Sequence, residues 1–111
     1  MSTTETHVWT GASGNQYKYS IHSLDTSFKE EAGNYIFAKL SPQYQWVPVY
    51  IGQTKDLNRR LENHEKEACA KRHGATHIHA HLTPGGEAVR LSEEADLLKK
   101  WNTDCNVQQN S

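Results

Sequence analysis

The stretch VYIGQTKDLNRRLENH, residues 49–64, decides the fold because it joins a strand pattern directly to a helix pattern. Residues 49–51 are two β-branched residues and a tyrosine, which favour a β-strand. Gly52 lies close to the junction, and Asp56 is suited to the N-cap of a helix, with Thr54 as the alternative. The stretch therefore predicts a strand followed by a helix that carries two adjacent arginines.

Further strand and helix patterns lie on both sides of this stretch. Residues 34–40 are rich in strand formers and predict a strand that pairs with residues 47–52 as a hairpin. Residues 77–82 alternate strictly between histidine and apolar side chains, so residues 75–82 predict a third strand. The first helix is expected to run from Asp56 to about Arg72, and a second helix covers roughly residues 89–101.

The N-terminal third is expected to lie outside this core. Residues 1–6 are predicted to be disordered, residues 7–22 to form a β-hairpin around the turn GASGNQ, and residues 27–30 to form a short helical turn. The predicted organisation is one α+β domain at 33–106, preceded by this start at 1–32 and followed by a flexible tail at 107–111.

Composition limits the function classes. The chain has 111 residues, a net charge of −1 and a mean hydropathy of −0.85, which argue against binding nucleic acid through bulk positive charge. Positive charge is nevertheless concentrated at residues 55–72, which hold six basic and four acidic side chains. No apolar run has the length of a signal peptide or membrane span, so we expect a cytoplasmic protein with no membrane partner. Both Cys69 and Cys105 are then expected to be free thiols, with a disulfide as the less favoured alternative.

Helical wheels orient the charged residues. On the first helix Arg60 falls beside the apolar stripe, close to His64 one turn later, whereas Arg59 falls on the far side. On the second helix Glu94 falls in the middle of the apolar arc. A carboxylate there must be protonated, paired or bound to a cation, so an ion pair with Arg60 and a metal site are both open.

These residues also carry a family motif. The chain resembles the GIY-YIG nuclease superfamily, and is similar to the N-terminal nuclease domain of excinuclease, in these residues: Gly33-Asn34-Tyr35, Tyr50-Ile51-Gly52, Arg60, His64, Glu94 and Asn106. The resemblance covers about residues 33–106, and Asn34 departs from it by replacing the isoleucine of the name motif. It implies a small antiparallel three-stranded sheet flanked by helices, to which the N-terminal hairpin is an addition.

The resemblance further implies a metal-dependent endonuclease that hydrolyses phosphodiester bonds, with DNA as the expected substrate and DNA repair as the expected setting. Glu94 would hold one Mg²⁺ or Mn²⁺ ion, and Arg60 would bind the phosphate. Tyr35 or Tyr50 would orient or deprotonate the attacking water. The remaining expected roles are contact with phosphate or the active tyrosine for His64, backbone binding for Lys55, and support of the site for Gly52 and Asn106.

Two other functions compete with this one. A nucleic-acid binding or scaffold module with the same fold but little catalysis is favoured by the low net charge. A zinc protein built on His77, His79 and His81 ranks last, because same-face positions on one strand lie about 7 Å apart and converge poorly on one ion. The chain has no room for a second specificity domain, so a homodimer or a partner protein is expected to supply specificity.

Overall fold

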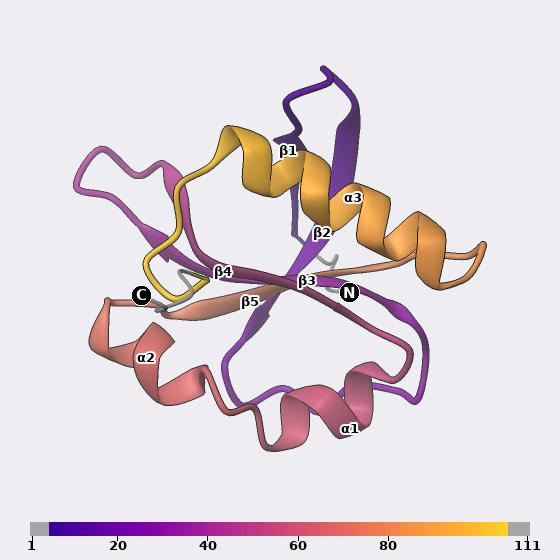
Figure 1. Cartoon of the computed structure of the whole chain (residues 1–111). Helices are drawn as coiled ribbons and strands as arrows, with labels where there is room; N and C mark the ends of the chain where they lie inside the picture. Colours follow the sequence, from indigo (N-terminus) through magenta and orange to yellow (C-terminus); the bar gives the residue numbers. More distant parts are fainter. Residues whose placement is uncertain (1–4, 107–111) are drawn as a thin grey trace, which may run out of the picture.

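The computed structural model describes residues 5–106, and its centre is one antiparallel sheet of five strands (Figure 1). The strands are β1 (Thr6–Thr10), β2 (Gln16–Ser23), β3 (Gly33–Leu40), β4 (Trp46–Thr54) and β5 (His77–Leu82). Their order across the sheet is β1-β2-β5-β3-β4, so β3 and β5 are paired on both sides and β4 forms an edge. Pro48, which cannot donate to a ladder, lies on this edge strand.

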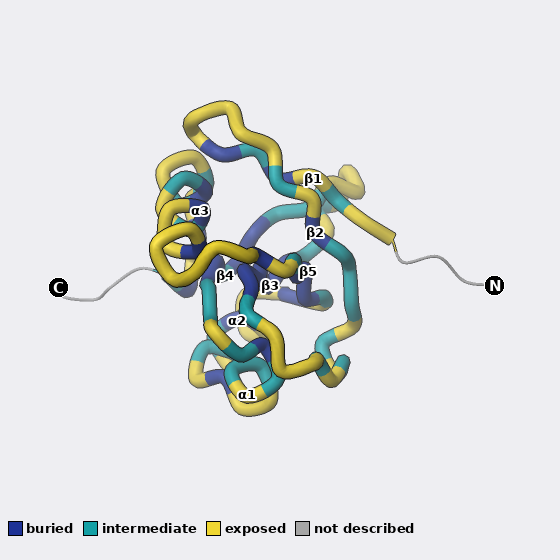
Figure 2. Tube along the Cα trace, turned by 90° about the vertical axis from the view of Figure 1, so that its right-hand side faces the viewer, coloured by how far each residue is buried: buried dark blue, intermediate teal, exposed yellow. Residues whose placement is uncertain are grey.

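Three helices cover the two faces of the sheet. Figure 1 shows α1 (Leu57–Glu62) and α2 (Glu67–Arg72) below the sheet and α3 (Glu87–Lys100) above it. In Figure 2 the buried residues are concentrated where β3 and β5 pass between these layers. None of the helices in residues 5–106 has the length and apolar character needed to cross a membrane.

The prediction of a three-stranded sheet was wrong. The N-terminal hairpin does not stand apart, because β2 pairs with β5 along a register that includes Ile21 opposite His79. Without this pairing, β5 would leave a row of unsatisfied backbone groups at the edge of the sheet. Sequence periodicity identified the strands but could not show which strand lies beside which. Residues 1–4 and the predicted tail at 107–111 lie outside the described residues.

Each face of the sheet carries its own apolar core. The core under α1 and α2 contains Tyr35, Phe37, Val49, Leu57, Ala70, Ala75, Ile78, Ala80 and Cys105. The core under α3 contains Trp9, Tyr19, Ile36, Ala38, Ile51 and Leu97. Neighbouring residues of β3 therefore alternate between the two cores, so the sheet separates α3 from the other helices.

The predicted helix from Asp56 to about Arg72 is in fact two short helices. Asp56 is the N-cap, as predicted, and its Oδ1 accepts a 3.1 Å hydrogen bond from the backbone N–H of Arg59. The chain then leaves the helix at Asn63, and His64 turns inward to become 4% exposed. The tertiary contacts of the buried His64 outweigh the local preference of this segment for a continuous helix. The predicted helical turn at 27–30 is likewise absent, because Phe28 packs against the core and its carbonyl accepts from Asn58.

The face of α3 that is buried also differs from the wheel. Glu93, which falls on the polar side of the wheel, is 5% exposed, whereas Leu91 is 43% exposed. The reason is the N-terminal hairpin, which covers that side of α3: Tyr19 donates to Glu93, and Tyr17 donates to Asp96. A helical wheel uses the residues of the helix alone. It therefore cannot predict that polar side chains of another segment bury the polar side of the helix.

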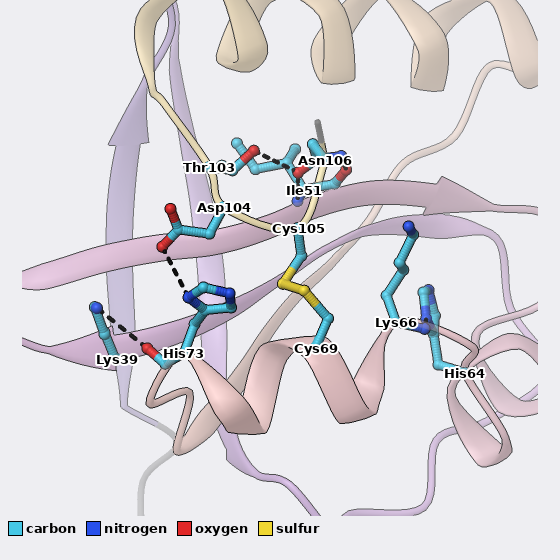
Figure 3. The surroundings of a disulfide bond; sticks show 10 residues. All are labelled: Lys39, Ile51, His64, Lys66, Cys69, His73, Thr103, Asp104, Cys105 and Asn106. Carbon is cyan, nitrogen blue, oxygen red and sulfur yellow. Dashed lines mark hydrogen bonds and ion pairs between the residues drawn. A yellow bond between two sulfur atoms is a disulfide. The ribbon is translucent and has the colours of Figure 1, made fainter. Parts of the chain in front are cut away.

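The two cysteines are not free. Cys69 of α2 and Cys105 form a disulfide across 36 residues of sequence (Figure 3). The expectation of two free thiols was therefore wrong for this structure. Sequence could not decide the pairing because it depends on how α2 and the C-terminal segment meet in space.

Candidate functional site

Two tyrosines of neighbouring strands share one face of the sheet. Tyr35 of β3 and Tyr50 of β4 have ring centroids 6.1 Å apart. Gly52 lies opposite Tyr35 in the register, and a Cβ there would lie 2.6 Å from the Tyr35 hydroxyl. Only glycine therefore lets the Tyr35 phenol lie across β4 toward the edge of the sheet.

His64 and Arg60 meet the hydroxyl of Tyr35. The Tyr35 Oη and the Nε2 of His64 are 2.6 Å apart, and the guanidinium of Arg60 lies close enough for its charge to oppose the rise that burial causes in the pKa of Tyr35. The His64 ring also contacts Tyr50 edge-on, at 5.1 Å between centroids. The residues Tyr35, Tyr50, Arg60 and His64 thus form one cluster, which we call the phenol cluster.

Protonation states within the phenol cluster follow from its hydrogen bonds. Nδ1 of His64 accepts a 2.9 Å hydrogen bond from the backbone N–H of Lys66. Burial, together with the charges of Arg60 and Lys66, lowers the pKa of His64 to about 4, so the imidazole is neutral at pH 7. Its proton is then on Nε2, which donates to Tyr35. Burial, first of all, raises the pKa of Tyr35, while Arg60 opposes that rise.

A polar hollow adjoins the phenol cluster at the end of β4. It has a volume of about 540 Å³ and is lined by Gln53, Thr54, Lys55, Arg60, Glu87 and Arg90. Three of these six side chains are cations, and Arg90 is held in place by donating a 2.9 Å hydrogen bond to Gln53. Arg60 belongs to both the hollow and the phenol cluster. We call this surface the cationic hollow.

Glu94 is placed differently from the other predicted residues. It lies on α3, across the sheet from α1, and is half-buried (Figure 1). Burial raises its pKa, and its carboxylate has no hydrogen bond or ion pair within residues 5–106. The alternative of an ion pair with Arg60 is not observed, because Arg60 pairs with Glu65 at 3.8 Å. The structure therefore brings Tyr35, Tyr50, Arg60, His64 and Lys55 to one end of β4 and leaves Glu94 on the α3 side.

Asn106 binds the edge of β4 between Tyr50 and Gly52. Its Oδ1 accepts from the backbone N–H of Ile51 at 2.7 Å, and its Nδ2 donates to the carbonyl of Ile51 at 2.8 Å (Figure 3). The side chain thus pairs with the strand as a neighbouring strand would. This contact holds the backbone of the strand that carries Tyr50. Asn106 would support the site in this way.

Two residues of this region, Arg90 and Glu93, were not predicted from the sequence. Arg90 lies one turn before Glu94 and within the same arc of the wheel, so the wheel could have revealed it. Glu93 accepts from Tyr19 at 2.6 Å and lies 2.9 Å from Nε2 of His81. Nothing in the sequence could have shown this buried contact, because Tyr19 is 74 residues away.

The three alternating histidines of β5 have different hydrogen-bond partners, although the ring of Trp46 contacts both His77 and His79. His81 pairs with Glu93, and His77 contacts the ring of Trp46 edge-on at 5.1 Å. His79 is fully buried, and its Nδ1 accepts from Nε1 of Trp9 at 3.0 Å. Among the described residues these imidazoles do not form a group that could hold one ion.

Comparison with family models, with curated proteins and with solved structures gave no match.

Proposed function

We propose that this chain is a metal-dependent endonuclease that hydrolyses phosphodiester bonds of nucleic acid, with DNA as the expected polymer. The observation that carries the proposal is the phenol cluster, in which Arg60 and His64 converge on the hydroxyl of Tyr35. The resemblance of the motif residues to GIY-YIG nucleases supports the same activity. The cationic hollow beside the cluster supports a polyanionic substrate, although the net charge of the chain is −1.

The cations of the hollow would bind the substrate. Lys55, Arg60 and Arg90 can each donate hydrogen bonds to phosphate oxygens, and the two guanidinium groups can do so through two nitrogens at once. Arg60 would hold the scissile phosphate because it is the cation of the hollow whose charge also acts on Tyr35. Its positive charge would stabilise the extra negative charge on that phosphate as the bond to water forms.

A tyrosine would handle the proton of the attacking water. As the water oxygen bonds to phosphorus and the bond from phosphorus to the 3′ oxygen breaks, the water proton passes to a phenolate, and solvent protonates the leaving oxygen. Tyr35 must first lose its own proton, against a pKa that burial raises. The positive charge of Arg60 and donation from Nε2 of His64 would stabilise the phenolate, which favours Tyr35 over Tyr50 in this role.

The metal ion of the proposal would be held by Glu94. The half-buried carboxylate has a pKa raised by burial and lacks a hydrogen bond within the described part of the chain, which is an unfavourable state that a cation would relieve. A single carboxylate suits Mg²⁺ or Mn²⁺, since such ions accept oxygen ligands and Mg²⁺ keeps several waters. The ion would supply charge stabilisation at a phosphate oxygen and at the leaving oxygen.

A binding module with little catalysis is the second candidate. The observation that favours it is the position of Glu94, whose pKa is raised by burial with no compensating contribution from Arg60. Such a module would use the cationic hollow to hold nucleic acid without cutting it. In either case a second copy of the chain or a partner protein would supply specificity.

The cytoplasmic location expected from the sequence is also a proposal, and the disulfide is more typical of an oxidising compartment.

Incubation of the full chain with nucleic acids of different structure would test the function. Duplex, branched and single-stranded DNA and RNA are each offered with Mg²⁺, Mn²⁺ or a chelator, and cleavage and binding are measured separately. Wild type is expected to cut at least one of them only with metal, and Tyr35→Phe is expected to bind but not to cut. Tyr44→Phe is the matched control because Tyr44 is 84% exposed on a turn. Binding without cleavage by wild type would support the second candidate, and cleavage that survives both the chelator and Tyr35→Phe would refute the mechanism.

A further inference from the structure

The disulfide forms part of a group with three metal-ligand side chains. His73 lies one helical turn after Cys69 at the end of α2, and its side chain lies beside the two sulfur atoms (Figure 3). One ligand atom from each of Cys69, His73 and Cys105 lies within 4.8 Å of the other two. Within residues 5–106 this is the only such group of three His, Cys, Asp or Glu side chains.

The spacing of this group suits zinc once the sulfur–sulfur bond is absent. Zinc binds thiolate sulfur at about 2.3 Å and imidazole nitrogen at about 2.0 Å in tetrahedral geometry, which puts neighbouring ligand atoms roughly 3.5 to 4 Å apart. The three ligand atoms are already within 4.8 Å of one another, so side-chain rotations alone can reach this arrangement. A cysteine and a histidine four residues apart on a helix also face the same side of it.

Asp104 supplies a further element of a zinc site. Its Oδ2 lies 3.4 Å from Nδ1 of His73 (Figure 3). Zinc-binding histidines usually donate their other ring N–H to a carboxylate, which fixes the tautomer and orientation of the ring. With Nδ1 directed to Asp104, Nε2 is the nitrogen on the side of the sulfur atoms in Figure 3. An ion could enter from the side of His73, which is exposed, and of Cys69, which is partly buried, whereas Cys105 is buried behind them.

We propose that the reduced protein binds one zinc ion through Cys69, His73 and Cys105, in place of the disulfide. A dithiol reductant supplies two electrons and two protons, so the sulfur–sulfur bond breaks, each cysteine becomes a thiol and the reductant becomes a disulfide. Zinc then displaces the two thiol protons and binds both thiolates and the neutral imidazole, with water at the fourth position. Either link joins α2 to the segment that carries Asn106, so the support of β4 is retained in both redox states.

Zinc stoichiometry of the untagged full chain tests this inference, which does not depend on the nuclease proposal. The chain is reduced with a phosphine, which does not compete for zinc as a dithiol does. It is then loaded with Zn²⁺, desalted and analysed by native mass spectrometry. One zinc per reduced chain and none per oxidised chain are expected. Substitution of Co²⁺ should give the absorption of a tetrahedral thiolate site in the reduced chain alone.

Two variants locate the ion. His73→Ala is expected to lose zinc on desalting without unfolding, because the side chain is exposed. His77→Ala is the matched control, since it removes a histidine from β5 and leaves the group of three intact. The proposal is overturned if the reduced chain takes up no zinc, if the oxidised chain binds it equally, or if His73→Ala retains the ion as tightly as His77→Ala does. Circular dichroism of each variant shows that a loss of zinc is not a loss of fold.

Discussion

The imidazole of His64 and the hydroxyl of Tyr35 lie 2.6 Å apart, and this contact links the fold to the proposed chemistry. His64 reaches Tyr35 because the chain leaves α1 at Asn63 and resumes a helix only at Glu67. The wheel places His64 beside the apolar stripe of one continuous helix, whereas the structure buries it in the segment between two helices. The break in the helix therefore gives Tyr35 a neutral hydrogen-bond donor in addition to the guanidinium.

The two adjacent arginines of α1 should differ sharply when each is removed. Arg60→Ala deletes the cation whose charge acts on Tyr35 and which lines the cationic hollow, so cleavage should fall by roughly 100-fold or more. Arg59→Ala removes an exposed side chain from the same helix and should change cleavage less than about twofold. Initial rates on one cleavable substrate, with folding checked by thermal unfolding, measure both effects. Equal losses in the two variants would contradict a specific role for Arg60.

The sequence predicted this part of the site because its determinants are local. The content of strand formers and the short connection placed Tyr35 and Tyr50 on paired strands, and the wheel separated Arg60 from Arg59. It failed wherever a distant segment decides the outcome. Glu93 is buried by Tyr19, the helix breaks because of Tyr35, and β5 pairs with β2 across more than half the chain. The wheel placed Glu94 within the apolar arc, and the residue is half-buried on α3, but a wheel could not show where α3 lies relative to α1.

Glu93 and Glu94 are adjacent acids that should respond to amide substitution in opposite ways. Glu94 has a pKa raised by burial, so its ionised form destabilises the folded state at pH 7. Glu94→Gln should therefore slightly raise the melting temperature while abolishing metal-dependent cleavage. Mg²⁺ should stabilise wild type in the same melting experiment and leave Glu94→Gln unchanged. A variant that is merely less stable, with cleavage retained, would contradict the metal role.

Glu93→Gln serves as the neighbouring control. Glu93 accepts from Tyr19 and lies within hydrogen-bond distance of His81, both in a buried setting. Replacing the carboxylate by an amide removes the negative charge and one of the two acceptor oxygens that face Tyr19 and His81, at a cost of about 1 to 3 kcal/mol. The free energy of unfolding in urea measures this loss, and cleavage per folded molecule should be nearly unchanged. A Glu93→Gln variant as stable as wild type would show that the buried contacts contribute little.

Stability should fall in mild acid because two buried histidines are neutral in the folded state. Burial, first of all, lowers the pKa of His64 to about 4 and that of His79 to about 3, from an ordinary value of 6.5. The unfolded chain binds protons at these sites below pH 6.5 and the folded chain does not, so stability is full above pH 6.5 and declines toward pH 3. His79 alone accounts for a loss on the order of 4 kcal/mol over this range. Urea unfolding as a function of pH should show a flatter profile for His79→Gln, whereas His77→Gln should follow wild type.

The support of β4 by Asn106 can be tested against a nearby asparagine. Asn106→Ala removes the acceptor for the backbone N–H of Ile51 and the donor for its carbonyl, which should cost about 1 to 3 kcal/mol and loosen the strand that carries Tyr50. Asn106→Asp should cost more at pH 7, because it keeps the acceptor but turns a negative oxygen toward the Ile51 carbonyl. Asn102 is exposed in the same segment, so Asn102→Ala should leave the melting temperature unchanged. If Asn106→Ala had the same melting temperature as Asn102→Ala and kept full activity, the two hydrogen bonds to Ile51 would have no part in positioning Tyr50.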